Sequence, residues 1–320
     1  MYKLKKTLLL AIAITCNSLL FAQYAKNIND PDAVYKSAKE FWQKEQYSLA
    51  YALFKQLYNN GNNESNLPVH IYSECKYYTL TLGLMQNDES VLNAALDYSA
   101  NETNVARADM INFPIAEYYY RHKNYSNAIT YYSKVKIDNF TNRELADMKF
   151  HQGYCYFTTQ QFEKAKPLFN VIRQINSDPN YIDANYYYGF ISFYEKRYAD
   201  AMECFKIVEN NDTYKNLVPF YIAEIYYFNG ERDKAIDYAE KALKKGNQFY
   251  DLQLRQLLGH SYFEKRRYPD ALPYLEQYVT KTEKVRREDL YELSYCYYEA
   301  NNWNKAISGF KQLGGKEDSL

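Results

Sequence analysis

The sequence predicts an all-α protein, an α-solenoid of about eight helix–turn–helix repeats. Three observations support this prediction: a repeat of about 35 residues, a helical spacing of apolar residues within each repeat, and a shortage of helix breakers. Only 10 Gly and 8 Pro occur in 320 residues, whereas 38 Tyr and 17 Phe supply many large side chains for a core. A chain of this composition is neither disordered nor rich in loops.

The overall charge excludes one class of partner. The 39 Lys and Arg residues balance 39 Asp and Glu residues, so the formal net charge at pH 7 is zero. Proteins that bind nucleic acids usually carry a clear excess of positive charge. We therefore expect no nucleic acid among the partners.

The first 22 residues have the pattern of a secretory signal peptide. Lys3, Lys5 and Lys6 precede the apolar run 8–14, and Ala22 supplies the small residue at the expected cleavage site. A membrane-spanning helix needs about 20 apolar residues, so we expect no transmembrane span. We predict cleavage after residue 22 and a linker over residues 23–31.

The end of the signal peptide predicts the location of the mature chain. The sequence LLFAQ resembles signal peptides of exported proteins of the Bacteroidota. We therefore expect the protein in the periplasm or on the periplasmic face of the outer membrane. Lipidation at Cys16 is a less favoured alternative, because Thr15 stands where a lipidation signal has a small residue such as Gly or Ala.

Residues 32–313 form the predicted repeat array. Seven times a small residue is followed twelve positions later by an alanine. These pairs are Ala38 and Ala50, Ala116 and Ala128, Gly153 and Ala165, Gly189 and Ala201, Ala223 and Ala235, Gly259 and Ala271, and Ser294 and Ala306. An aromatic residue precedes six of the seven alanines by three positions, and mostly bulky apolar residues follow four and seven positions later. These spacings define one face of a helix, so each repeat contains a first helix with the small position and a second helix with the key alanine.

This pattern resembles the tetratricopeptide repeat. The clearest copies are FHQGYCYFTTQQFEKAKPLF (150–169) and YYYGFISFYEKRYADAMECF (186–205). The resemblance implies stacked helix pairs in a right-handed superhelix with a concave inner surface. It also implies a protein–protein interaction scaffold.

Two features depart from the regular repeat. The pattern is lost between residues 57 and 104, where we expect an Asn-rich loop over 59–66 followed by an irregular second repeat of two helices at about 67–100. Pro167 and Pro273 each lie two residues after a key alanine, inside the second helix. We expect at most a local distortion from each proline, although an interior proline costs a helix roughly 3 kcal/mol.

Residues 314–320 are expected to be a tail that follows the last pair. No amphipathic sealing helix follows the segment NNWNKAISGFKQLGG, and such helices commonly close repeat arrays. We expect that the native chain is longer. A partner that covers this end, or self-association, is the alternative.

The sequence offers no catalytic or metal-binding pattern. His70, His122, His151 and His260 are far apart, and none belongs to a metal-binding motif. Cys75, Cys155, Cys204 and Cys296 each lie within a predicted helix, so we interpret them as buried small apolar residues with free thiols. We therefore expect no enzyme activity, no cofactor and no bound metal.

The candidate binding residues lie on the first helices. In tetratricopeptide arrays the residues three before and four after the small position line the concave groove. Thirteen of these fourteen positions are aromatic here, and Gln256 takes the other. The predicted partner-binding residues are Tyr35, Trp42, Phe113, Tyr120, Phe150, Phe157, Tyr186, Phe193, Phe220, Tyr227, Phe263, Tyr291 and Tyr298. The alternative is that these rings pack between helices, because the repeat itself favours tyrosine there.

These observations together predict a non-catalytic scaffold of the bacterial cell envelope. Its partner would be another envelope protein or a peptide segment, bound along the aromatic groove, because tyrosine combines a large contact area with a hydroxyl group. The alternative is a glycan-binding component associated with the outer membrane, in which the rings would stack on sugars.

Overall fold

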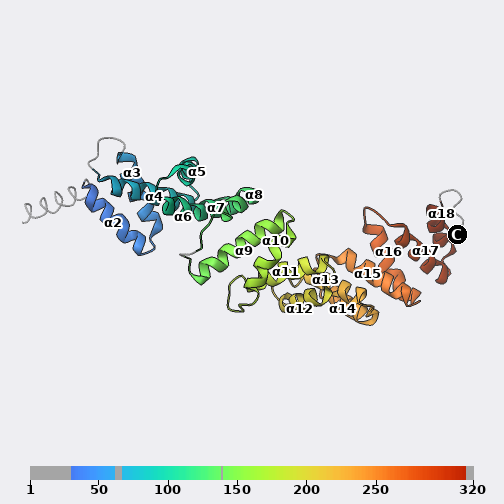
Figure 1. Cartoon of the computed structure of the whole chain (residues 1–320). Helices are drawn as coiled ribbons and strands as arrows, with labels where there is room; N and C mark the ends of the chain where they lie inside the picture. Colours follow the sequence, from blue (N-terminus) through green and yellow to red (C-terminus); the bar gives the residue numbers. More distant parts are fainter. Residues whose placement is uncertain (1–29, 62–66, 138–139, 315–320) are drawn as a thin grey trace, which may run out of the picture. The chain divides into compact units, whose positions relative to one another are not determined.

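The computed structural model describes residues 30–61, 67–137 and 140–314, and these residues form helices without any strand (Figure 1). The predicted signal peptide and most of the predicted linker lie outside this range. None of the described helices is long and apolar enough to cross a membrane. The elements are α2 (Pro31–Gln43), α3 (Tyr47–Gly61), α4 (Val69–Met85), η1 (Glu89–Val91), α5 (Leu92–Asn101), α6 (Val105–Met110), α7 (Asn112–Arg121), α8 (Tyr125–Tyr132), α9 (Asn142–Thr158), α10 (Phe162–Ile172), α11 (Tyr181–Tyr194), α12 (Tyr198–Val208), α13 (Val218–Phe228), α14 (Arg232–Lys245), α15 (Asp251–Glu264), α16 (Tyr268–Lys281), α17 (Arg287–Glu299) and α18 (Trp303–Leu313).

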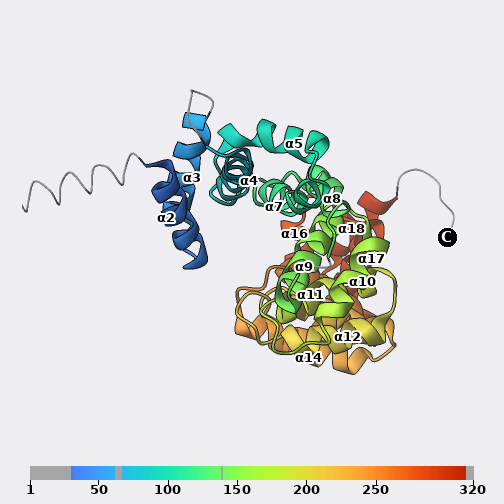
Figure 2. The same cartoon turned by 60° about the vertical axis from the view of Figure 1, so that its left-hand side comes forward.

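The chain divides into two compact units, residues 1–160 and 161–320. In the first unit α2 packs on α3, α3 on α4, α4 on α7, α7 on α8 and α8 on α9. The helix α5 lies against α4 and α7 (Figure 2). The sequence predicted the two helices of this irregular region but not the short helix α6, which leads into α7 through Ile111.

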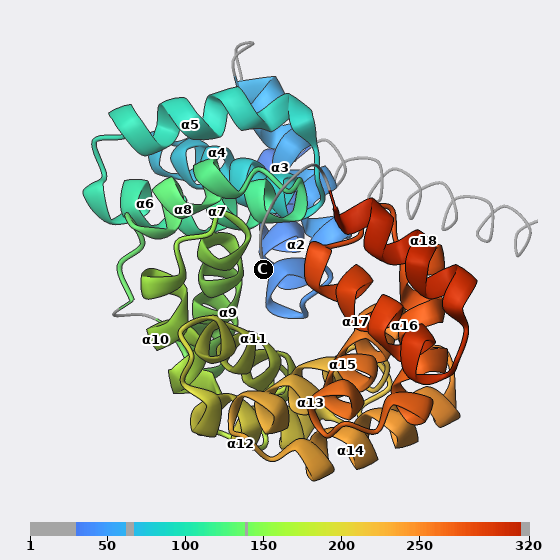
Figure 3. The same ribbon diagram turned by 90° about the vertical axis from the view of Figure 1, so that its right-hand side faces the viewer.

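The second unit is a regular stack of helix pairs. The pairs α11 and α12, α13 and α14, α15 and α16, and α17 and α18 follow α10, and each helix also packs on its successor. Within this unit the first helices α11, α13, α15 and α17 lie along the inner side, and α12 and α14 lie outside them (Figure 3). Pro167 and Pro273 lie inside continuous helices, α10 and α16.

The small positions allow the two helices of a pair to approach closely. A Cβ atom added at Gly189 would lie 2.8 Å from the Cβ of Cys204 on α12. A Cβ added at Gly259 would lie 2.6 Å from Cγ of Leu275 on α16. The key alanines Ala201 and Ala271 are fully buried, and the residues that Gly189 and Gly259 approach lie three or four positions after them. The small residue therefore lies where the two helices of a pair meet.

Each turn inside a pair contains a residue in the left-handed region, five positions before the key alanine. Its φ lies between 56° and 79° in all seven pairs, and the residues are Glu45, Lys123, Gln160, Lys196, Gly230, Arg266 and Asn301. After Lys196, the backbone N–H of Arg197 donates to the carbonyl of Ser192 at 2.8 Å, which closes a Schellman motif at the end of α11. This turn satisfies the last carbonyls of the first helix and reverses the chain.

All four cysteines of the described chain are buried and free. Burial raises the pKa of the Cys204 thiol to about 11. A thiol with so high a pKa is unreactive at neutral pH. The predicted burial of these side chains is confirmed.

Candidate functional site

The predicted binding residues fall into three groups by exposure. Phe150 and Tyr186 are buried, whereas Trp42, Tyr291 and Tyr298 are 37%, 44% and 49% exposed. The other eight rings are half-buried. A half-buried ring is held by its neighbours on one side and presents the other side to a ligand or to solvent.

Packing contacts account for part of the aromatic content. The ring of Tyr186 stacks on Tyr214 with 4.2 Å between centroids, and Phe193 meets Tyr221 edge-on at 5.2 Å. These pairs lie in the core between α11 and α13. Tyr186 therefore supports the helix stack, whereas the rings of Tyr291 and Tyr298 on α17 are exposed.

In the first unit one predicted residue lines a cleft. Phe113 lies beside Val105, Met110, Val135 and Phe140 in a mostly apolar cleft of about 480 Å³. Phe113 and Phe140 meet edge-on with centroids 5.0 Å apart. A cleft of this size takes one or two apolar side chains of a partner.

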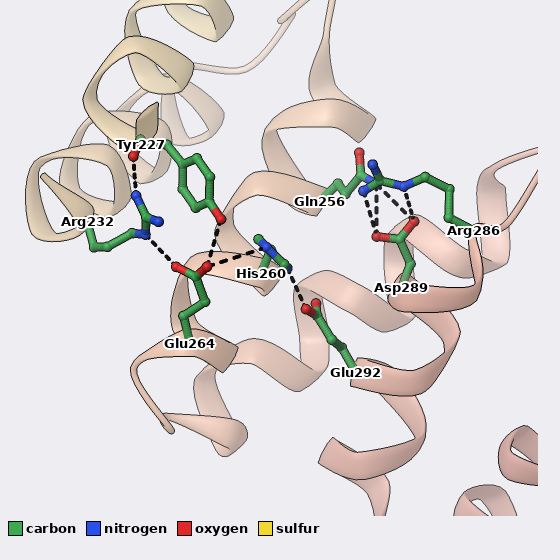
Figure 4. A network of polar contacts seen from close by, with 8 residues as sticks. All are labelled: Tyr227, Arg232, Gln256, His260, Glu264, Arg286, Asp289 and Glu292. Carbon is green, nitrogen blue, oxygen red and sulfur yellow. Dashed lines mark hydrogen bonds and ion pairs between the residues drawn. The ribbon is translucent and has the colours of Figure 1, made fainter. Parts of the chain in front are cut away.

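A polar network in the second unit joins α15 to α17 at one end (Figure 4). Asp289 is only 1% exposed, and both of its oxygens accept hydrogen bonds from Gln256 at 2.9 Å. The Arg286 guanidinium donates to the same two oxygens at 2.9 and 3.0 Å. Gln256 is the one non-aromatic residue among the fourteen predicted groove positions. Its side chain donates hydrogen bonds to a buried carboxylate.

The network continues through His260. Its Nδ1 lies 2.5 Å from Oε1 of Glu292, which is 5% exposed, and its Nε2 lies 3.7 Å from Oε1 of Glu264. The hydrogen bond with Glu292 is the largest cause that raises the pKa of His260 above its ordinary value of 6.5. The contact with Glu292 therefore favours the charged form of the His260 side chain.

Residues of α13 and α14 extend the network beyond Glu264 (Figure 4). Tyr227, a predicted binding residue, donates its hydroxyl hydrogen bond to Glu264 at 2.8 Å. Arg232 lies with its guanidinium carbon 3.6 Å from the Tyr227 ring centroid and pairs with Glu264. Arg232 lies three positions before the key alanine Ala235, where the other six pairs have an aromatic residue. Its ion pair with Glu264 connects α14 to the next first helix, α15.

The contact between His260 and Glu292 follows a register that sequence reasoning missed. The residue one after the small position on a first helix meets the residue two before the small position on the next first helix. Glu117 and His151 form such a pair in the first unit, with Oε1 and Nδ1 2.9 Å apart. Phe190 and Tyr221 form the aromatic version in the second unit, with centroids 5.7 Å apart.

His151 and His260 each pair with a glutamate of a neighbouring first helix. Within the described ranges, no three His, Cys, Asp or Glu side chains are placed to hold a metal ion. The sequence does show an ionisable residue directly after the small position in two repeats, Glu117 and His260. Predicting their partners would have required knowing which positions of neighbouring repeats are in contact.

Part of the second unit matches a known protein family by sequence. The family model described as tetratricopeptide repeat matches residues 220–283 and 257–313, which cover α13 to α18 except the first two residues of α13. No curated protein matches the chain. The three helix pairs from α13 to α18 thus match the tetratricopeptide repeat by sequence.

Several solved structures resemble the chain in part. MamA AMB-1 is 20% identical over 56% of this chain and 94% of its own, with a TM-score of 0.46. The Pseudomonas aeruginosa pilF structure is 16% identical over 69% of this chain and 92% of its own, with a TM-score of 0.47. A tetratricopeptide repeat protein from Parabacteroides merdae is 14% identical over 83% and 98%, with a TM-score of 0.40. Such values describe a partial likeness of architecture and not a shared function.

Proposed function

We propose that this tetratricopeptide repeat protein is a non-catalytic scaffold of the cell envelope that binds an extended segment of another protein. The observation that carries the proposal is the row of aromatic rings on successive first helices, held in place and partly open. In the second unit this row ends in the exposed rings of Tyr291 and Tyr298. In the first unit Phe113 lines an apolar cleft.

The physical reason is preorganisation. Tyr291 lies 6.0 Å from Phe310 and Tyr298 lies 5.2 Å from Trp303, centroid to centroid, so each ring is braced by a second helix. A braced ring loses little conformational entropy when a ligand covers it. Tyrosine also offers a hydroxyl to the backbone of an extended segment.

The envelope location rests on residues 1–22, whose cationic start, apolar run and small residue at position 22 favour export. The partner would then be a periplasmic protein or the periplasmic part of a membrane protein. Fractionation of cells that produce the full chain tests this part directly. Recovery of the uncleaved protein in the cytoplasm would contradict it.

Site-specific photo-crosslinking tests the binding surface. A photoreactive amino acid at Tyr298 on α17 should form adducts with a defined partner in intact cells, because that ring is 49% exposed. The matched control is the same amino acid at Lys241, an exposed residue of the second helix α14. Identical adducts from both positions would contradict a binding face on the first helices.

A titration separates the glycan alternative. Soluble oligosaccharides added to the purified full chain should give no binding heat if the rings hold a protein segment. Saturable heat that is lost in a Tyr291→Ala and Tyr298→Ala double variant would favour the glycan-binding function instead.

A further inference from the structure

One carboxyl group on the inner face of the second unit lacks the partner that the repeat register gives to its equivalents. Glu224 on α13 follows the small position Ala223 by one residue, as Glu117 follows Ala116 and His260 follows Gly259. Glu117 pairs with His151 and His260 pairs with Glu292 on the next first helix. The corresponding residue opposite Glu224 is Leu257.

Glu224 is therefore a half-buried acid without a counter-charge. Across the described residues, it makes no hydrogen bond and no ion pair with the protein. Burial raises the pKa of Glu224 to about 7, and burial is the only cause of that shift. A nearby cation stabilises the ionised form of such a desolvated carboxyl group more than it stabilises an exposed carboxylate.

Two exposed rings lie next to this carboxyl. Phe228 is one helical turn beyond Glu224 on α13 and is 51% exposed, so both side chains point from the same face. Tyr194 at the end of α11 is 60% exposed, and desolvation, Tyr250 and then the charge of Glu224 raise the pKa of its hydroxyl. An acid flanked by open aromatic rings suits a cation that carries an apolar stem.

We propose that Glu224 anchors a lysine or arginine side chain of the extended segment bound on the inner face of the second unit. This inference rests on the proposed scaffold function and adds to it the chemistry of one partner residue. The carboxylate of Glu224 accepts the charged hydrogen bonds of the basic group, and Tyr194 and Phe228 cover its stem and its charge. The basic side chain takes the place opposite Glu224 that His151 takes opposite Glu117 in the first unit.

A double-mutant cycle with synthetic peptides tests the inference. An array of acetylated and amidated twelve-residue peptides of random sequence is probed with the purified full chain. The best binders are then resynthesised with each Lys or Arg replaced by Gln, and their affinities are measured by fluorescence anisotropy. One such replacement should weaken binding to the unaltered chain at least tenfold and leave binding to the Glu224→Gln variant unchanged.

The control is Glu163→Gln on the second helix α10, an exposed glutamate for which the tenfold loss should persist. Circular dichroism confirms that both variants keep their helices. The inference is overturned if the best binders carry no basic residue, or if the loss is the same in Glu224→Gln as in the unaltered chain. In those cases the scaffold function stands. If no peptide binds the unaltered chain, both the inference and the scaffold function fail.

Discussion

Nδ1 of His260 lies 2.5 Å from Oε1 of Glu292, and the two residues stand on successive first helices. The pair Glu117 and His151 repeats the same contact in the first unit with acid and base exchanged. The same two repeat positions are therefore in contact in both units, while the residue types at these positions differ. This pairing joins neighbouring repeats through a polar contact in addition to apolar packing.

The first prediction concerns the pH dependence of this contact. The folded-state pKa of His260 lies above its ordinary value of 6.5, so its contribution to stability is fully present below pH 6.5 and is lost as pH rises through the raised value. His260→Gln should therefore lower the free energy of unfolding by about 1 kcal/mol at pH 5.5 and by less at pH 9. Urea unfolding at both pH values measures the difference.

The control for this experiment is His70→Gln. His70 is exposed and makes no hydrogen bond among the residues that the structure describes. Its replacement should change stability equally little at both pH values. A His260→Gln effect that is as large at pH 9 as at pH 5.5 would mean that packing, not charge, dominates the contact.

The second prediction has the opposite sign of pH dependence to an ordinary paired carboxylate. The pKa of Glu224 is raised from 4.5 to about 7. Between these two pH values the carboxyl group is protonated in the folded protein and ionised in the unfolded chain. Stability from this group is present below pH 4.5 and is lost as pH rises toward 7. Above pH 7.5, Glu224→Gln should stabilise the protein by about 1 kcal/mol after allowance for its partial exposure.

Thermal unfolding of Glu224→Gln and the unaltered chain from pH 4 to pH 8.5 checks this sign. The variant should gain in relative stability as the pH rises. Equal stability of both proteins across the range would show that the carboxylate is solvated in the folded state. The matched variant Glu163→Gln should follow the unaltered chain, because that side chain is exposed.

The helix pairs were predictable from the sequence because each pair is determined by local signals. At Gly189 and Gly259 the small residue lies where the two helices of a pair meet, and the spacing to an alanine twelve positions later recurs seven times. The short helix α6 was missed because its six residues, VARADM, carry no amphipathic period long enough to detect.

The candidate site was predictable only in part. The residues three before and four after the small position were identified from the family resemblance, and the structure shows Tyr186 buried and Tyr298 exposed at such positions. The exposed fraction of each ring depends on the side chains that neighbouring repeats pack against it. The sequence of a single repeat does not contain this information. The isolation of Glu224 arises because Leu257 stands where the register elsewhere supplies a charge or a ring.

The third prediction uses the turns within the pairs. Gly230 has a φ of +79°, and no atom would lie within 4 Å of a Cβ placed there. Gly230→Ala should therefore destabilise the protein by about 1 kcal/mol through backbone strain alone. Arg266→Gly removes the same strain from a residue with a φ of 58° and should not destabilise the protein.

Chemical denaturation of the second unit within the full chain measures both effects. Gly314→Ala is the control, because its φ of −79° is open to any residue. A stability loss in Gly314→Ala as large as in Gly230→Ala would show that the left-handed turn is not the cause.

The last prediction tests the close approach of α15 and α16. A Cβ at Gly259 would lie 2.6 Å from Cγ and Cδ2 of Leu275 and 3.2 Å from its backbone nitrogen. The backbone nitrogen cannot rotate away, so Gly259→Ala should force the two helices apart and cost about 1 to 3 kcal/mol. The control Gln253→Ala changes an exposed residue of the same helix and should alter stability by less than about 0.5 kcal/mol. Because Leu275 also packs in the core that reaches α17, the Gly259→Ala variant should lose protection from hydrogen exchange in α16 and α17 before α11. Uniform loss across the second unit would show instead that its helix pairs unfold as one block.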